Sequence, residues 1–324
     1  MRNRFEDIEN FIMDIMEKVK ADNKDIEKID IYSKLSSYGL TDEERKNKGT
    51  LIDIQDRLYK NFRYEVFSRC WKSRNNYWLV FREESIDDMI RTGTYFNQEA
   101  IKIYIPAKEE DMYEIANGLF EFLDKNYIEN DTKMSADVRA DDLVVRVFSQ
   151  RDASYISEYI NNNFPNRTLS PNPFMINDGT VGIASDGKLS YNERVAGFLA
   201  DYFSDLRNKG QLENANMKSF KEYMEKMRNE IYSDKTAMKT FLQKKDKHFD
   251  SVSDLEYLYD NKNIMDFIII ALDKEKGIED FNKHWEEIKT SESKKTTRDN
   301  IKELLDSFER EQPSNNDDQE FGEK

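Results

Sequence analysis

The sequence has little of the residues that build disulfides, metal sites and nucleotide-binding loops. Its 324 residues include one cysteine, Cys70, and two histidines, His248 and His284. A lone cysteine cannot form a disulfide within the chain. Because both histidines lie far apart in the helical part of the sequence after 210, we do not expect a structural zinc site or a Ser-His-Asp arrangement. The GxGxxG and GxxxxGK[ST] motifs are both absent. We therefore expect no metal and no cofactor. The single cysteine also indicates a protein that works in a reducing compartment, or at least one that does not depend on disulfide formation.

Long apolar runs and an excess of positive charge are also missing. The longest late apolar run, IMDFIIIAL at 264–272, is far short of the roughly 20 residues that a spanning helix needs. The first residues contain acidic side chains among the apolar ones and no continuous signal core. The net charge of −15 disfavours nucleic acid and anionic membranes as partners. The expected location is the cytoplasm, with export by a signal-less route left open.

Hydrophobic spacing predicts an α+β fold. Apolar residues recur every three or four positions at 5–19, 51–67 and 111–127, which indicates helices, with a weaker helix at 25–40. Runs of β-prone residues at 77–81, 101–106 and 143–148 predict strands, and 132–138 is a short strand or an extended link. Helices and strands in this order are typical of a layered domain, in which 143–148 is central because both of its faces are apolar.

The stretch 165–187 holds three of the five prolines and reads as one long loop, either functional or disordered. Beyond residue 210 the chain is charged and helical until its last, polar residues. These changes predict an N-terminal helical segment (1–50), an α+β domain (51–209), a separate C-terminal helical region (210–310) and a disordered tail (311–324).

Four cations of the α+β region are candidate anion ligands: Lys102, Lys133, Arg139 and Arg146. Near the ends of neighbouring strands they could form an anion pocket, with arginine suited to bidentate phosphate contacts. They could equally be surface partners for the many carboxylates. The strand at 101–106 alternates in the same way: its isoleucines share one face, and Lys102 and Tyr104 share the other. That second face either lines a groove or is an ordinary solvent-exposed face. The pair Asp141-Asp142 is interpreted as a turn and strand cap rather than an acid/base pair.

The order of these pieces from 64 to 203 resembles the HopA-type bacterial effector family and, more distantly, the phosphothreonine-lyase-like domain of lanthipeptide synthetases. The matching features are SRCWKSRNNYWLVF, the KIYIP strand, a helix, a lysine-bearing link, RADDLVVRVFS, and a Pro/Gly loop leading to SYNERVAGFLADYF. The resemblance covers under half of the chain.

What this resemblance implies is an α+β fold with a mixed sheet and helices, and β-elimination of phosphate from phosphothreonine or phosphoserine in a peptide. It assigns Lys133 as the base and Lys102, Arg139 and Arg146 as phosphate ligands. The family places a histidine acid on the strand where this chain has Tyr104, which would then be the proton donor. The implied partner is a phosphorylated peptide or protein, supplied by a separate kinase.

Two other functions remain open from the sequence. The chain could bind a protein or phosphopeptide partner without turning it over, as a non-enzymatic effector or defence protein, with the helices after 210 as one candidate surface. A purely structural or scaffold role is the third possibility.

Overall fold

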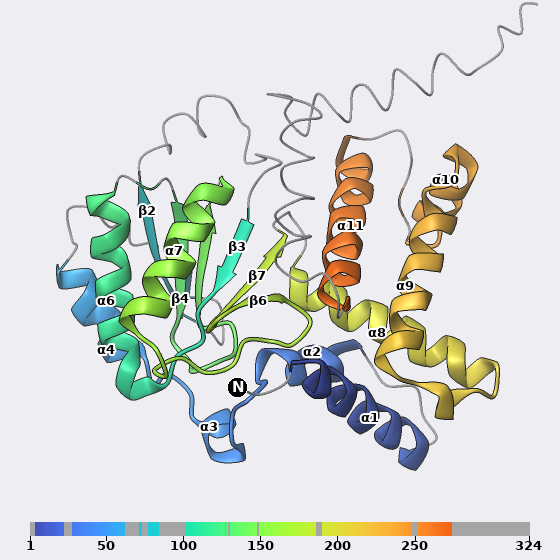
Figure 1. Ribbon diagram of the computed structural model, residues 1–324, viewed down its shortest axis with the longest axis horizontal. Coiled ribbons are helices and arrows are strands. Elements are labelled where there is room, and N and C mark those ends of the chain that lie inside the picture. Colours follow the sequence, from blue (N-terminus) through green and yellow to red (C-terminus); the bar gives the residue numbers. More distant parts are fainter. Residues whose placement is uncertain are drawn as a thin grey trace, which may run out of the picture.

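A computed structural model describes most of the chain and places its helices around one sheet (Figure 1). Described are residues 4–22, 28–61, 71–72, 77–83, 101–126, 128, 130–147, 149–185, 190–245, 247 and 252–273. The predicted helical residues 62–67, the predicted helices after 273 and the predicted disordered tail lie outside these ranges. The boundaries drawn at 50, 209 and 310 stay predictions.

The described strands form one seven-stranded sheet in the order β1-β2-β4-β5-β3-β7-β6. The strands are β1 (Trp71–Lys72), β2 (Tyr77–Glu83), β3 (Ile101–Tyr104), β4 (Asn130–Ser135), β5 (Leu143–Val147), β6 (Ile176–Asp178) and β7 (Val181–Ser185). The α+β class is confirmed, and β5 is a central strand as its two apolar faces predict. Each described pairing is antiparallel, where a mixed sheet was expected. Two hairpins, β4–β5 and β6–β7, account for part of this, because consecutive strands that pair directly with each other through a hairpin connection run in opposite directions.

Two long helices cover one face of the sheet (Figure 1). They are α6 (Glu109–Lys125) and α7 (Gln150–Asn163), and α7 contacts β3, β5 and β7. Their apolar faces bury residues at helical spacing, including Leu119 and Leu123 of α6 and Ile156 and Ile160 of α7. A shorter helix, α4 (Ile52–Asn61), packs beside α6 and β2. The helices predicted at 51–67 and 111–127 are thus present, with α4 described to residue 61.

The remaining helices lie beside the β6 edge of the sheet, except the short helix α3, which lies below the sheet in this view (Figure 1). They are α1 (Arg4–Asp22), α2 (Lys28–Ser36), α3 (Asp42–Lys46), α8 (Tyr191–Asn208), the 3-10 turn η1 (Leu212–Asn214), α9 (Met217–Ile231), α10 (Lys235–Gln243) and α11 (Val252–Ala271). Helix α11 contacts both β6 and β7, and α2 packs along α8. One hydrophobic core runs through these helices and the sheet. In the part of the chain that is described, no helix is long and apolar enough to cross a membrane.

The stretch 165–187 is not one long loop, because it contains the β6–β7 hairpin. The two strands are joined by Gly179 and Thr180, and Gly179 has φ +64°, a value that favours glycine. The Asn161 side chain of α7 holds this turn: it accepts from the Thr180 backbone at 2.8 Å and donates to the Asp178 carbonyl at 3.0 Å. The strand signal was hidden because β6 has three residues and β7 contains a glycine, Gly182.

Candidate functional site

Arg146 lies at the centre of a group of predicted site residues on one face of the sheet. It pairs with Lys102 of β3 on one side and with Asp131 of β4 on the other. Residues directly opposite each other in a ladder point to the same face, so the three side chains form a row across the strands. Tyr104 and Lys133 both pair with Val144, two residues before Arg146. They therefore share this face and are its diagonal neighbours, roughly 7–8 Å away.

This face differs from the opposite face of the central strands in the solvent exposure of its side chains. In β3, β4 and β5 the residues that are not buried are Lys102, Asp131, Lys133 and Arg146. All four are charged, all four lie on the face just described, and three are cations. The opposite face carries Ile103, Val145 and other fully buried residues, and it is the face on which α6 and α7 pack. We call the row Lys102–Arg146–Asp131 with Lys133 the charged face.

The loop before β6 covers the sheet at the β7 side of the charged face. A Cβ placed on Gly182, the neighbour of Tyr104 in β7, would lie 2.8 Å from Pro171 and 2.9 Å from the sulfur of Met175. The proline-rich stretch therefore packs directly on the sheet at this point.

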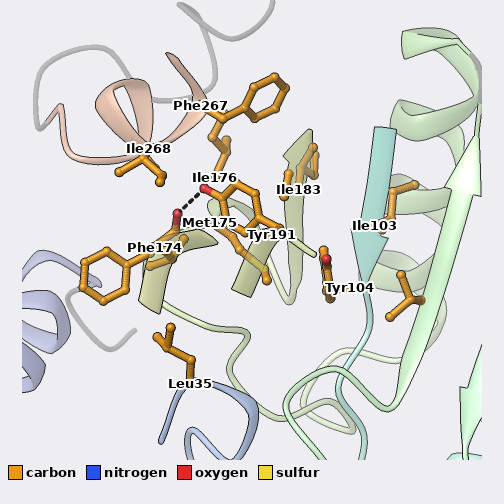
Figure 2. Close-up of a cluster of buried hydrophobic side chains, with 14 of the residues drawn as sticks. Leu35, Ile103, Tyr104, Phe174, Met175, Ile176, Ile183, Tyr191, Phe267 and Ile268 are labelled. Atoms are coloured by element: carbon orange, nitrogen blue, oxygen red, sulfur yellow. Dashed lines mark hydrogen bonds between the residues drawn. The ribbon is translucent and has the colours of Figure 1, made fainter. Parts of the chain in front are cut away.

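Tyr104 belongs to the core rather than to open space. It is 5% exposed and is part of the hydrophobic cluster. Figure 2 shows its side chain among core residues, on the side of β3 that faces Met175 and Tyr191, with Ile103 pointing the other way. By contrast Lys133 is exposed. The expected acid and base thus share a face of the sheet but differ in access to a ligand.

Arg139 lies apart from the charged face, in the loop between β4 and β5. Its Nε donates to Oδ1 of Asp141 at 2.7 Å, and its Nη2 lies 3.3 Å from Oδ2 of Asp141 and 3.4 Å from the Tyr32 hydroxyl of α2. Burial acts to lower the pKa of Arg139, but the charge and hydrogen bonds of Asp141, helped by Tyr32, raise it above its usual value. The guanidinium therefore stays charged and holds the loop to α2.

The two aspartates of this loop act as the turn interpretation predicts. Asp142 is completely buried and accepts hydrogen bonds from the backbone nitrogens of Arg139, at 3.2 Å, and Ala107, at 3.4 Å. Burial raises the pKa of its carboxyl well above the ordinary value, and the charge of Asp141 adds to this. Its oxygens fix the loop rather than face a ligand.

A buried amide network that sequence reasoning missed extends from this loop. Asn192 of α8 donates to Asp141 at 3.3 Å and accepts from Asn172 at 2.8 Å, and Asn172 in turn accepts from the Phe174 backbone at 2.9 Å. The Tyr191 hydroxyl donates to the Phe174 carbonyl at 2.7 Å (Figure 2). The network joins the β4–β5 loop, the proline-rich stretch and α8. Its only sequence signal was the PNPF segment, whose Asn172 precedes a proline.

Among the described residues, no group of three His, Cys, Asp or Glu side chains is placed so that it could hold a metal ion. His248, His284 and Cys70 lie outside these ranges.

No family model matches the chain, and no curated protein matches it. Solved structures similar to it include two bacterial effector proteins. One is an effector protein from Pseudomonas syringae pv. syringae strain 61, with a TM-score of 0.42 and 12% identity over 69% of this chain and 92% of that one. The other is an effector protein from Pseudomonas syringae pv. tomato strain DC3000, with a TM-score of 0.41 and 11% identity over 69% of this chain and 95% of that one. At this level of similarity neither structure assigns an activity to this chain.

Proposed function

We propose that the charged face binds a phosphorylated peptide or protein, with Arg146 and Lys102 as the main phosphate ligands. One observation carries the proposal: the accessible residues of the three central strands are all charged, lie on one face, and are mostly cations in a chain of net charge −15. Arginine offers a planar pair of N–H donors to two phosphate oxygens, and lysine adds a second charge next to it.

The negative charge of Asp131 weakens the attraction of the charged face for phosphate and determines from which side a phosphate can approach Arg146. Asp131 pairs with Arg146 on the side away from Lys102. A dianionic phosphate would therefore approach the Lys102 side of Arg146, where the two cations are direct neighbours across the ladder. Lys133, one residue row along the same face, is then placed to contact the phosphorylated residue or its peptide backbone.

The second candidate is turnover of the same ligand by β-elimination. In that reaction the neutral amine of Lys133 would take the α-proton of phosphothreonine, a Cα–Cβ double bond would form, and the bond from Cβ to the phosphate oxygen would break. The observation that favours it is the exposed position of Lys133 diagonal to Arg146. The proton for the leaving phosphate would have to come from Tyr104, which is buried. The geometry therefore supports binding better than turnover.

Fluorescence anisotropy with a labelled phosphothreonine peptide and its unphosphorylated twin tests the binding proposal. We expect a preference for the phosphopeptide that Arg146→Gln weakens by tenfold or more, since a charge-assisted hydrogen bond contributes roughly 1.5–3 kcal/mol. The matched control is Lys125→Gln, an exposed cation on α6. Equal binding of the two peptides, or equal loss in both variants, would overturn the proposal. Mass spectrometry of the same mixture shows whether phosphoric acid is lost, which separates the two candidates.

A further inference from the structure

A hollow lies on the side of the sheet opposite the charged face, between α6 and α7. It has a volume of about 620 Å³ and is lined along α7 from Arg151 to Asn163, with Phe122 and Ile128 on the facing wall. The twelve steps of helix from Arg151 to Asn163 extend roughly 18 Å at 1.5 Å per residue, so the hollow is a groove rather than a round pocket. An extended peptide of five or six residues has about this length. We call it the α6–α7 groove.

The groove is built on aromatic rings. Tyr159 stacks on Phe122 with ring centroids 4.2 Å apart and an angle of 16° between the rings. One helical turn earlier, Tyr155 is 45% exposed and is among the most exposed large hydrophobic side chains of the described residues. The Arg151 guanidinium lies 5.3 Å from the centre of the Tyr155 ring. Tyr155 thus already receives a cation from its own helix, which shows the contact that its ring favours.

Negative charge predominates around these rings. Asp152 and Glu158 line the groove against the single cation Arg151. Burial raises the pKa of Tyr159, and the nearby charge of Glu121 raises it further, so a third carboxylate acts on the groove. Within the described part of the chain, Glu158 has no hydrogen-bond or ion-pair partner, whereas Asp152 accepts from Ser149 at 2.7 Å. Aromatic rings beside carboxylates form a surface for a positively charged side chain.

We propose that the α6–α7 groove binds an extended basic segment of another protein, with an arginine or lysine side chain lying against Tyr155 and paired with Glu158. Charge complementarity identifies the occupant, because the groove combines cation-binding rings with the exposed carboxylate of Glu158. The site is independent of the charged face, which is on the opposite side of the sheet and attracts anions. One protein molecule can therefore hold a phosphate-bearing ligand and a basic segment at the same time.

Selection from a randomised hexapeptide library on phage, with the full chain as bait, tests the proposal. We expect the retained peptides to be enriched in arginine and lysine. A fluorescein-labelled copy of the best peptide should then bind Tyr155→Ala/Glu158→Gln at least fivefold more weakly than wild type. The chain offers a matched control on α4, where Asp56 and Tyr59 have the same spacing and are exposed, Tyr59 by 41%. Asp56→Asn/Tyr59→Ala removes the same groups and should leave binding unchanged.

Three outcomes would overturn the proposal: no peptide retained by wild type, retained peptides without an excess of basic residues, or equal weakening in the two double variants. The last would mean that the acidic surface as a whole attracts the peptide. Because all four substituted side chains are exposed, circular dichroism spectra of both variants should match that of wild type. Retained peptides rich in acidic residues would assign the groove to the opposite class of partner.

Discussion

Arg139 and Asp141, two residues apart in the loop between β4 and β5, form a two-pronged ion pair in which both side chains are largely buried. The pair ties the loop to α2 through Tyr32 and to α8 through Asn192. Arg139, predicted from the sequence as a phosphate ligand, thus helps to hold the β4–β5 loop of the sheet against α2 and α8.

Replacing Arg139 separates these two roles. We expect Arg139→Met to lower the free energy of unfolding by about 3 kcal/mol, because it leaves the buried charge of Asp141 without its partner. Urea denaturation measures this, and Lys125→Met, which breaks only an exposed pair with Glu121, should cost less than about 0.5 kcal/mol. Unchanged stability together with lost phosphopeptide binding would show that Arg139 serves the ligand instead.

Asp142 makes stability depend on pH in an unusual direction. Its folded pKa is raised well above the ordinary value by burial, so the folded state holds the proton more tightly than the unfolded state. The contribution of Asp142 is therefore most favourable below its unfolded pKa of about 4 and is lost as pH rises toward its folded pKa. Relative to Asp142→Asn, wild type should lose stability between pH 4 and pH 7. Parallel denaturation curves for the two proteins across this range would contradict the expected shift.

Two glycines with the same backbone angle form a controlled pair. Gly179 and Gly210 have φ +64° and +65°, and a Cβ on Gly179 would lie 2.3 Å from Oδ1 of Asn161, whereas none of the described atoms lies within 4 Å at Gly210. We expect Gly210→Ala to cost about 1 kcal/mol from the backbone alone. Gly179→Ala should cost clearly more, because the Asn161 hydrogen bonds to the hairpin turn must also shift. Thermal unfolding of both variants gives the comparison.

The substitution Tyr104→Phe tests whether the Tyr104 hydroxyl contacts the ligand or the side chain serves only in the core. Because its side chain lies in the core, we expect the variant to bind the phosphothreonine peptide within about twofold of wild type. If wild type releases phosphoric acid from the peptide, the same variant decides whether Tyr104 is the acid. Release that continues at the wild-type rate would exclude that role.

Local pattern was enough to place most of the described elements, but it did not determine which charges meet. The alternation at 101–106 and the β-prone run at 143–148, apolar on both faces, identified strands. These patterns could not reveal that Lys102 and Arg146 are direct neighbours while Arg139 is not, since that depends on ladder register and on the β4–β5 turn. The β6–β7 hairpin was missed because its strands are short, and the partner that stabilises its turn, Asn161, comes from another element.

The hydrogen bonds of Arg4 have a consequence for how the chain folds. From the first turn of α1 its guanidinium donates to the carbonyls of Met175 and Ala271, which follow it by 171 and 267 residues. Contacts over such separations raise the contact order and slow folding, since the intervening loops must close first. During synthesis the first helix must wait until almost the whole described chain has left the ribosome before it can complete its bonds. A chain that ended before α11 would still contain every residue of the charged face, but Arg4 would lose its hydrogen bond to the Ala271 carbonyl.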